Sequence, residues 1–348
     1  GDEFVAILQD INELSRISNI TERMLKCFDT PVDISSTEIF SSICIGVALY
    51  PDDDNGEHLL KYADAAMYHA KEQGGNNYQF YNEKLTQQIQ QRLNMETRLR
   101  HALEREEFVL FYQPIFSLKD QSIIGVEALI RWNDPEHGLI MPDSFIPLAE
   151  ETGLIVAIGD WVLKHACLQA KKWEAEGFGS LHLAINVASL QFEHDRLYWS
   201  VVSTLKDSGF PAQQLELEIT ERMFLNISGT VRETLDKLTA KGVKLSIDDF
   251  GTGYSSLSYL KQLPINTLKI DRSFIMGIPG DKDDVQITAT IITMAHGLNM
   301  DVVAEGIETE YQLEYLNSLG CGRGQGYYLS KPLSVEDITS LLKTRLNG

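Results

Sequence analysis

The chain has 348 residues, 43% hydrophobic and 23% charged, which is enough for two globular domains with a sizeable core. Its formal net charge of −20 argues against a protein that wraps duplex nucleic acid, because such proteins present basic surfaces to the phosphates. No apolar stretch reaches the roughly 18 residues that span a bilayer, since Asp160 interrupts the longest candidate, Leu154 to Leu163. We therefore expect no membrane contact by this chain.

Residues 1–83 predict a small α/β unit. The strand-like run FVAIL covers residues 4–8, and a second apolar run, SSICIGVALYP, covers residues 41–51. Because the chain begins inside this unit, at Gly1 and without an initiator Met, we expect the unit to be incomplete and the sequence to be a piece of a longer protein.

Two helices are predicted next. The first covers residues 58–75 and ends in Gly74 and Gly75, which are well suited to terminate a helix. The second covers residues 84–106, where apolar residues recur mostly at four-residue steps: Ile89, Leu93, Leu99 and Leu103. We interpret this second helix as a connection to a further domain over residues 107–348.

The remaining residues alternate strand-like and helix-like segments. Strands are predicted over residues 108–116, 122–132, 181–187, 215–220, 243–248, 266–270, 300–306 and 325–330. Amphipathic helices are predicted over residues 156–176, 195–208, 228–241, 284–297 and 309–319. This order predicts an α/β fold, a modified TIM-like (β/α)₈ barrel. The segment 117–121 is too short for a parallel crossover, so the first strand should be antiparallel to the second.

Polar residues stand at the ends of these strands, where barrels of this kind carry their working groups. In chain order they are Glu127, Asn186, Glu218, Glu221, Asp248, Asp249, Lys269, Glu305, Glu308 and Gln325. The carboxylates among them would repel one another at a single rim unless they took up protons or bound cations. Oxygen ligands favour Mg²⁺ or Mn²⁺ over zinc. The alternative is that these acids cap helices or carry solvated loop charge.

The residue types point to a reaction. Paired hard metal ions with acidic ligands and a nearby lysine suit in-line attack of water on a phosphodiester. Lys269 could orient that water or stabilise developing charge, and Glu305 could be a base or a ligand of a second ion. Residues 248–257, DDFGTGYSSL, predict a mobile loop that positions metal ligands. Glu216 could fill the barrel or bind a metal ion.

Eight ordered blocks resemble the EAL phosphodiesterase family, and the resemblance covers residues 86–346. They are YQPIF at 112–116, VEALIRW at 126–132, INVAS at 185–189, LEITER at 217–222, DDFGTGYSSL at 248–257, LKIDRSF at 268–274, VAEGIET at 303–309 and GQGYYLSKP at 324–332. The resemblance implies hydrolysis of cyclic di-GMP to linear pGpG with two Mg²⁺ or Mn²⁺ ions, and inhibition by Ca²⁺.

The resemblance also implies roles for individual residues. The first metal ion would be held by Glu127, Asn186, Glu218 and Asp248. The second would be held by Asp249 and Glu305, with Asp248 bridging. Lys269 would orient water, Glu221 would hold the mobile loop, and Glu308 would be a supporting acid. The dinucleotide would contact Gln113, Leu129, Arg131, Asp271 and Gln325. No catalytic position departs from the family pattern.

Residues 1–81 resemble the C-terminal half of a GGDEF diguanylate cyclase domain, through GDEF at 1–4, SICIGVALYP and ADAAMYHAKEQGGN. Gly75 stands where that family usually has arginine. The resemblance implies no cyclase activity by this chain, a homodimer through the barrel, and a cytoplasmic location, alone or as part of a membrane-attached bacterial protein. Two alternatives to the enzyme are a catalytically silent cyclic di-GMP receptor and an unrelated metal-dependent barrel hydrolase.

Overall fold

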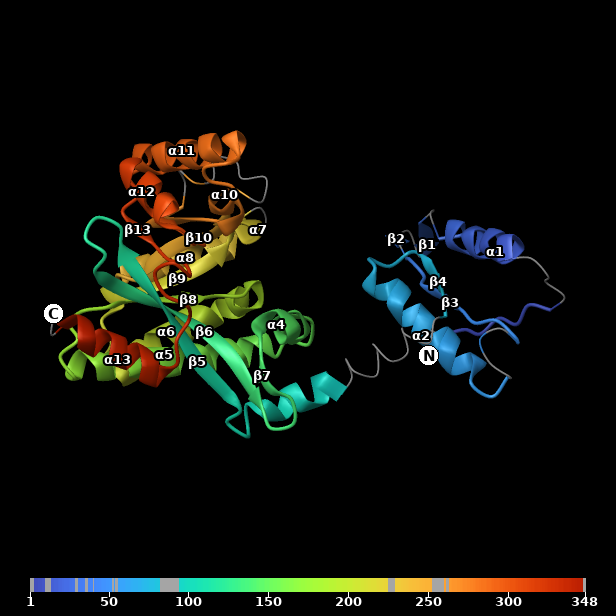
Figure 1. The fold of residues 1–348 in the computed structure, drawn as a ribbon. Coiled ribbons are helices and arrows are strands. Elements are labelled where there is room, and N and C mark those ends of the chain that lie inside the picture. The colour runs from blue at the N-terminus through green and yellow to red at the C-terminus, as the bar shows by residue number, and fades with distance from the viewer. Residues whose placement is uncertain are drawn as a thin grey trace. The chain divides into compact units, whose positions relative to one another are not determined.

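The computed structural model describes residues 3–9, 14–28, 31–34, 37–39, 41–51, 53, 56–81, 94–224, 229–251, 260 and 263–346. The chain divides into two compact units, Gly1–Arg98 and Leu99–Gly348 (Figure 1). Their boundary falls inside the predicted connecting helix. The domain limits at residues 83 and 106 stay predictions.

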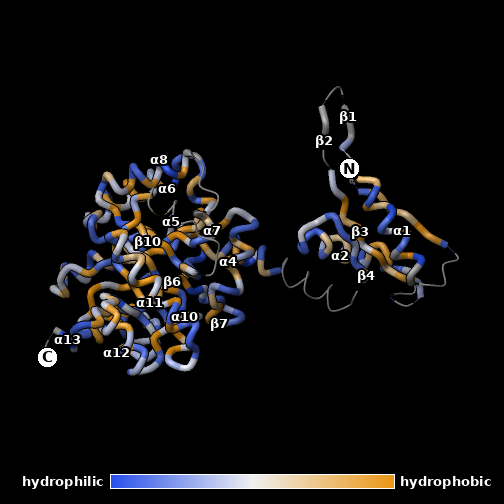
Figure 2. Tube along the Cα trace, turned by 90° about the horizontal axis from the view of Figure 1, so that it is seen from above, coloured by the Kyte–Doolittle hydropathy of each residue, from blue (hydrophilic) through white to orange (hydrophobic). Residues whose placement is uncertain are grey.

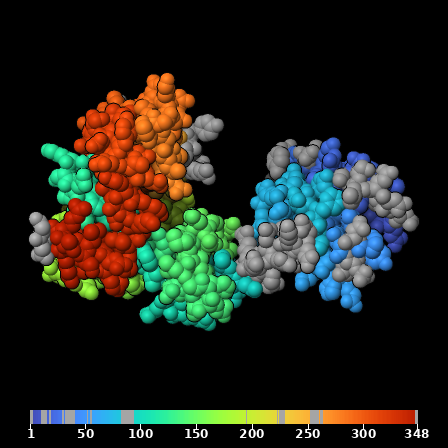
Figure 3. Space-filling view, in the orientation of Figure 1, coloured from blue at the N-terminus to red at the C-terminus, as the bar shows by residue number. Residues whose placement is uncertain are grey.

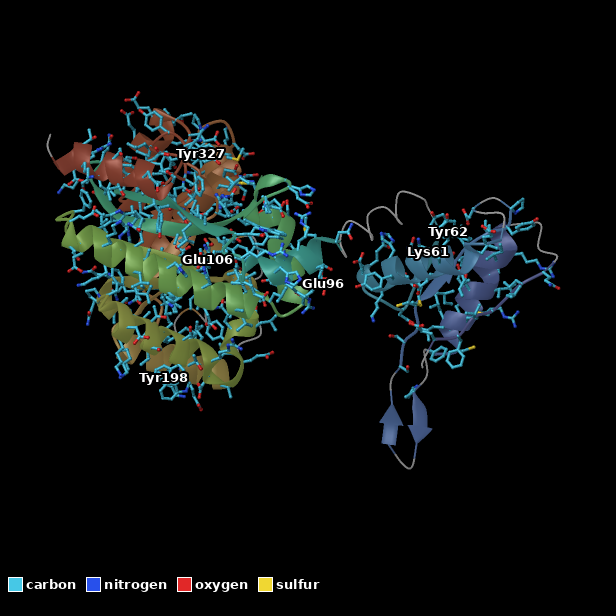
Figure 4. All side chains as sticks on the ribbon, turned by 90° about the horizontal axis from the view of Figure 1, so that it is seen from below. Lys61, Tyr62, Glu96, Glu106, Tyr198 and Tyr327 are labelled. Atoms are coloured by element: carbon cyan, nitrogen blue, oxygen red, sulfur yellow. The ribbon has the colours of Figure 1, made fainter. Side chains whose placement is uncertain are left out.

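The first unit is a small α/β arrangement. Its described elements are α1 (Leu14–Lys26), β1 (Val32–Ile34), β2 (Thr37–Ile39), β3 (Ile45–Val47), α2 (Leu59–Glu72) and β4 (Tyr78–Phe80). β1 and β2 are antiparallel, whereas β3 and β4 are parallel and joined through α2. Gly46 lets α2 approach β3 closely, because a Cβ there would lie 1.8 Å from the carbonyl oxygen of Ala63. Tyr62, labelled in Figure 4, stacks on Tyr81 with ring centroids 4.0 Å apart.

The predictions for the first unit have mixed outcomes. α2 ends before Gly74 and Gly75, whose φ angles of 103° and 72° confirm their terminating role. Within residues 41–51, the strand is limited to β3. The strand predicted over residues 4–8 is wrong, because residues 3–9 form no strand in the structure. Residues 3–9 are all exposed, so this apolar run packs against no described sheet that would hold it as a strand.

Part of the helix predicted over residues 84–106 is present, while its connecting role stays a prediction. Residues 94–102 are helical, with Leu99 and Ala102 fully buried. The helix ends four residues before the predicted end at Glu106, whose φ of 56° is incompatible with a continuing helix. Its predicted first part, residues 84–93, lies outside the described residues.

The second unit is a closed barrel of eight strands, which confirms the predicted fold class. In their order around the barrel they are β5 (Phe108–Ser117), β13 (Arg323–Gly324), β12 (Asp301–Ala304), β11 (Thr267–Ile270), β10 (Lys244–Phe250), β9 (Leu215–Thr220), β8 (His182–Asn186) and β6 (Ile123–Asp134). β5 closes the ring and is antiparallel to both neighbours, as predicted for the first strand. The other neighbouring pairs are parallel.

Helices surround the strands. They are α4 (Pro142–Glu151), α5 (Ile155–Ala175), α6 (Arg196–Ser208), α7 (Glu221–Phe224), α8 (Gly229–Ala240), α10 (Arg272–Met276), α11 (Lys282–Gly297), α12 (Glu310–Ser318) and α13 (Val335–Leu346), with 3₁₀ turns at Ser189–Asp195 and Ala212–Gln214. The five predicted helices agree with α5, α6, α8, α11 and α12 to within two residues at each end. Figure 3 shows the C-terminal segment in red on the same face as α11 in orange. Among the described residues, no helix has the length and hydrophobicity needed to cross a bilayer.

The strands separate apolar from acidic side chains. Along β9, Leu215, Leu217 and Ile219 alternate with Glu216 and Glu218, and all five residues are buried. Because neighbouring side chains on a strand point to opposite faces, the apolar residues face the helices and the acids face the barrel interior. Figure 2 shows hydrophobic residues along the central strands and hydrophilic residues on the surrounding helices. Glu216 and Glu218 therefore place acidic groups inside the barrel.

The last strand differs from its prediction. β13 covers Arg323–Gly324, whereas the predicted strand over residues 325–330 is a turn. Gly326 explains the turn, because a Cβ there would lie 2.2 Å from the backbone of Ile307, and its carbonyl oxygen accepts hydrogen bonds from the amides of Leu329 and Ser330. A short strand that was not predicted, β7 (Gly138–Ile140), pairs with the end of β6.

Candidate active site

Polar side chains converge at the edge of the barrel where the parallel strands end, which we call the mouth. Lys269 lies on β11, Glu218 on β9 and Asp248 on β10, while Glu305 directly follows β12. The strand register places Asn186 opposite Glu218 on neighbouring strands. Because parallel strands end at the same edge, residues far apart in sequence meet there.

The Lys269 ammonium lies at the centre of this group. Its Nζ is 2.7 Å from Glu218 Oε2 and 2.7 Å from Glu305 Oε1. The same atom is 3.1 Å from Asp248 Oδ1 and 3.5 Å from Glu127 Oε2. The lysine side chain is only 2% exposed. We call these five residues the mouth cluster: four carboxylates share one buried cation.

Two amides hold the carboxylates of the mouth cluster in place. The Gln325 Nε2 donates to Glu127 Oε2 at 2.7 Å and to Glu305 Oε1 at 2.8 Å. The Asn186 Nδ2 donates to Glu127 Oε1 at 2.8 Å. Both oxygens of Glu127 are therefore bound to neighbouring side chains. The predicted residues Glu127, Asn186, Glu218, Asp248, Lys269, Glu305 and Gln325 form one connected group.

The electrostatics of the mouth cluster favour additional positive charge. Burial and the nearby charge of Glu127 raise the pKa of Glu218 well above its usual value. Burial raises the pKa of Glu305 to about 8, although Lys269 opposes that shift. Burial also acts to raise the pKa of Glu127, but Lys269 and the two amides outweigh it and lower that pKa. Without further cations, the cluster therefore retains protons near neutral pH.

The oxygen donors suit hard divalent cations. Buried Asp248 Oδ1 and Gln325 Oε1 have no hydrogen-bond partner, although Asp248 Oδ1 lies close to the lysine ammonium. Carboxylate and amide oxygens are the ligands preferred by Mg²⁺ and Mn²⁺. In the described part of the chain, no three His, Cys, Asp or Glu side chains already form a metal cage. The ammonium instead occupies the centre of the oxygen donors.

Glu221 binds the beginning of the predicted mobile loop. Its side chain is buried, and its Oε2 accepts a hydrogen bond of 2.8 Å from the amide of Gly251. Gly251 has φ of 102°, and a Cβ there would lie 2.6 Å from the Phe274 ring. Asp249, also at positive φ, is exposed beside this turn. Residues 252–257 of the predicted loop lie outside the described residues.

The predicted substrate contacts surround the mouth. Gln113 lies opposite Glu127 in the β5–β6 register, and its Nε2 donates to the carbonyl oxygen of Ser330 at 3.3 Å. Leu129 shares the Glu127 face of β6 and is partly exposed. The Arg131 guanidinium lies 5.6 Å from the centre of the Phe111 ring. Burial lowers the pKa of Arg131, whereas the nearby Tyr327, Glu127 and Asp143 raise it.

Two predicted residues lie at helix caps shortly after β11 and β12. Asp271 caps α10 by accepting a hydrogen bond of 3.0 Å from the amide of Ser273. The side chain of Glu308 is exposed, and its backbone amide donates to Gln312 in the cap of α12. The exposed position of Glu308 fits the alternative left open by the sequence, a solvated loop charge, whereas the cap formed by Asp271 was not predicted.

Glu216 lies at the other end of the barrel interior, which we call the floor. Its Oε2 is 3.9 Å from an Arg323 guanidinium nitrogen, and the same guanidinium lies 2.5 Å from Asp301. This placement fits a barrel-filling polar residue, one of the two alternatives that the sequence left open. Arg323 was not singled out from the sequence, because no motif marks a lone arginine before the Gly-Gln-Gly segment.

Two family models match the chain. The one described as "EAL domain" matches residues 96–332, and the one described as "Diguanylate cyclase, GGDEF domain" matches residues 1–77. A solved structure described as "PaMucR Phosphodiesterase, c-di-GMP complex" is 46% identical, with a TM-score of 0.68. It is similar over 70% of this chain and 99% of its own.

Two curated relatives from Pseudomonas aeruginosa are also similar. "Bifunctional diguanylate cyclase/cyclic di-GMP phosphodiesterase MucR" is 45% identical over 97% of this chain and 49% of the relative. "Cyclic di-GMP phosphodiesterase NbdA" is 40% identical over 99% of this chain and 44% of the relative. The chain thus spans about half of each relative's length or less.

Proposed function

The chain belongs to the EAL domain family, and from this premise we propose that its barrel hydrolyses cyclic di-GMP to linear 5′-pGpG. The observation that carries the proposal is the convergence of four carboxylates on the buried ammonium of Lys269. Such a group attracts divalent cations, and a cyclic dinucleotide presents phosphodiesters for them to bind. The similarity to a phosphodiesterase described as a c-di-GMP complex supports this choice of substrate.

The donors of the mouth fit two Mg²⁺ or Mn²⁺ ions. The proposed ligands of the first ion are Glu127, Asn186, Glu218 and Asp248, and those of the second are Asp248, Asp249 and Glu305. When bound, the two ions neutralise the phosphodiester and lower the pKa of the attacking water. The position of Asp248 Oδ1, 3.1 Å from the shared ammonium among the other oxygen donors, supports this assignment.

The chain's own residues orient the reacting groups. Lys269 supplies a cation that can orient the attacking water or stabilise charge on the phosphate. Glu305 either accepts a proton or holds the second ion; bound cations would oppose the burial that raises its pKa in the metal-free protein. Gln325 keeps Glu305 and Glu127 in a fixed relation through its two hydrogen bonds. Glu221 fixes the start of the loop at Gly251.

Substrate binding is assigned to residues around the mouth. Arg131 can bind an anionic or base oxygen, because its guanidinium is held beside Phe111 at the edge of the site. The other proposed contacts are Gln113, Leu129, Asp271 and Gln325. Glu308 is proposed as a supporting acid of the same rim.

One assay tests the proposal. The purified chain is incubated with cyclic di-GMP and Mg²⁺, Mn²⁺, Ca²⁺ or EDTA, and the products are separated by liquid chromatography. We expect pGpG with Mg²⁺ or Mn²⁺ and inhibition by added Ca²⁺, which tolerates looser coordination than this chemistry requires. No turnover with either Mg²⁺ or Mn²⁺ would contradict the proposal. Tight binding without cleavage would favour the silent receptor instead.

Assembly and location are further proposals. We propose a homodimer formed through the barrel, which sedimentation of the purified chain can test, and a cytoplasmic location. A monomer at micromolar concentration would contradict the proposed dimer.

A further inference from the structure

β13 is the shortest strand in the described part of the barrel, yet the residue that follows it, Gln325, holds two carboxylates of the mouth cluster. It pairs with β12 through Arg323 and Gly324, and with β5 through the same two residues. The next residue, Gln325, donates to both Glu127 and Glu305. A two-residue strand has few ladder hydrogen bonds to fix its register. The Gln325 backbone also bonds to Ala304 and Ile307, and a side-chain contact on β13 can add to these constraints.

Arg323 supplies a constraint at the floor. One guanidinium nitrogen lies 2.5 Å from Asp301 Oδ2, at the start of β12. Another lies 3.9 Å from Glu216 Oε2, on β9 and therefore not on a strand next to β13. One side chain thus connects β13 both to its neighbour and across the barrel interior. A planar guanidinium with several donors can hold two carboxylates in fixed directions.

The floor and the mouth cluster are adjacent layers. Glu216, Glu218, Lys269 and Arg323 line the same small cavity, whose volume is about 10 Å³. Glu216 and Glu218 are two residues apart on one strand and share its inward face. Arg323 and Gln325 are likewise two residues apart. A displacement of β13 at the floor would therefore move the amide at the mouth.

We propose that Arg323 is a positioning residue for phosphodiester cleavage. It fixes β13 through a hydrogen bond to Asp301 and a longer contact with Glu216, and it thereby holds the Gln325 amide against Glu127 and Glu305. The contact acts on the reaction through Gln325 alone, from the end of the barrel opposite the mouth. This inference rests on the proposed function, because its kinetic consequence requires turnover of cyclic di-GMP.

Replacing Arg323 should lower kcat moderately and change KM little. Loss of a residue that orients metal ligands typically costs 10–100-fold in metal affinity or activity. Gln325 contacts the proposed ligands Glu127 and Glu305 directly, whereas Arg323 acts on them only through Gln325. We therefore expect Arg323→Gln to lower kcat by about 5–10-fold, while KM changes by less than about twofold. Arg323→Lys keeps the charge at the floor and should recover at least half of the lost rate.

A double-mutant cycle tests the route through Gln325. kcat is measured for the wild-type chain, Arg323→Gln, Gln325→Ala and the double variant. The control is Arg196→Gln, which removes a 3.2 Å contact to Asp160 on the outside of the barrel and should leave kcat unchanged. If Arg323 acts through Gln325, Arg323→Gln has no further effect on kcat when Gln325→Ala is already present.

Hydrogen exchange supplies a readout that is independent of activity. Exchange of the peptide covering residues 321–326 is measured in metal-free protein, where the amide of Gln325 donates to the carbonyl oxygen of Ala304 at 2.9 Å. Arg323→Gln should accelerate exchange in this peptide relative to Arg196→Gln. If Arg323→Gln does not fold, Asp301→Asn removes one anchor and should show both effects at about two- to threefold.

The outcomes separate the two proposals. If the wild-type chain shows no turnover, the proposed function fails, whereas exchange in residues 321–326 still reports on β13. If the wild-type chain is active and Arg323→Gln has unchanged kcat and exchange, only the positioning role fails. That role is also overturned if Arg323→Gln lowers kcat by the same factor in the wild-type chain and in the Gln325→Ala variant.

Discussion

At the mouth of the barrel four carboxylates contact one ammonium, whereas at the floor one guanidinium contacts two carboxylates. If every group were ionised, the mouth would carry a formal charge of −3 (one minus four), and the floor −1 (one minus two). The two groups also differ in burial, because the four mouth carboxylates are at most 17% exposed, whereas Asp301 at the floor is 57% exposed.

The difference separates a site that needs a ligand from one that does not. Burial, and after it the neighbouring carboxylates, raise the pKa of both Glu218 and Glu305 at the mouth. The floor pairs its buried Glu216 with Arg323, and Lys244 lies opposite Glu216 on the neighbouring strand. An uncompensated buried charge is costly, so it marks a place where cations bind in the working protein.

Glu127→Gln should produce the largest effect on activity. The carboxamide keeps the shape of the side chain but removes a charge that the proposed ions require. We expect turnover of cyclic di-GMP to fall by about 10³-fold, which corresponds to roughly 4 kcal/mol of transition-state stabilisation. Glu174→Gln, on the outside of α5, is the matched control and should keep full activity. A loss below tenfold would contradict a ligand role for Glu127.

Lys269→Met should distinguish the mouth from an ordinary ion pair. Removing the shared cation leaves four carboxylates without it, and breaking a buried pair typically costs about 3–5 kcal/mol of unfolding free energy. We expect a loss of this size in urea unfolding with EDTA, and partial recovery with Mg²⁺ or Mn²⁺. Lys171→Met removes a 2.7 Å pair with Glu174 outside the barrel and should cost about 0.5 kcal/mol. Equal losses for the two variants would remove the proposed distinction.

The pKa of Glu305 predicts a pH dependence. That pKa is raised to about 8 in the folded metal-free protein, so protons and metal ions compete for the carboxylate. Affinity for Mn²⁺ should increase about tenfold between pH 7 and pH 9. Calorimetric titration of the wild-type chain measures the dependence, and Glu305→Gln should weaken it. An affinity independent of pH in this range would contradict the prediction.

The same raised pKa fixes the direction of a stability change. Between the unfolded pKa of 4.5 and the folded value of about 8, the folded state holds more protons than the unfolded state. The contribution of Glu305 to stability is therefore present at low pH and is lost as pH rises through about 8. In EDTA, Glu305→Gln should reduce this decrease in unfolding free energy.

Glu216→Gln should produce the smallest effect. The carboxamide removes only a long ion-pair contact of 3.9 Å, and the guanidinium keeps its hydrogen bond to Asp301. We expect a loss of about 1 kcal/mol or less in urea unfolding and no more than a threefold decrease in kcat. Mn²⁺ affinity should be unchanged within about twofold. A loss of metal binding as large as that of Glu127→Gln would make Glu216 a ligand and erase the contrast between mouth and floor.

The sequence predicts the barrel and its rim well, for a physical reason. Periodicity identifies β9 and its inward acids, and the barrel rule places strand ends at one edge. Glu127, Glu218, Asp248 and Glu305 are consequently brought together as predicted. The EAL blocks added the identity of the reaction, which the fold alone does not determine.

Other features depend on which residues meet across the closed barrel, and the alternation of strands and helices along the sequence does not encode those contacts. Nothing in the segment TLKI indicates that Lys269 reaches four carboxylates on or just after four different strands. The aromatic run after Gln325 has the composition of a strand, yet the approach of Gly326 to Ile307 makes it a turn. The pairing of Glu216 with Arg323 joins residues 107 positions apart (323 minus 216). Such contacts are visible only once the barrel is closed.

The reversed direction of β5 decides where the polypeptide enters the barrel. Phe108 pairs with Trp132 near the mouth, and Ser117 pairs with Arg323 at the floor. Just upstream, the carbonyl oxygen of Glu107 accepts from the amide of Asn133 at 2.7 Å. In a barrel with a parallel first strand, the incoming segment would arrive at the far end. Here the incoming segment joins the barrel on the same side as the mouth cluster, so a force on that segment would act first beside the mouth.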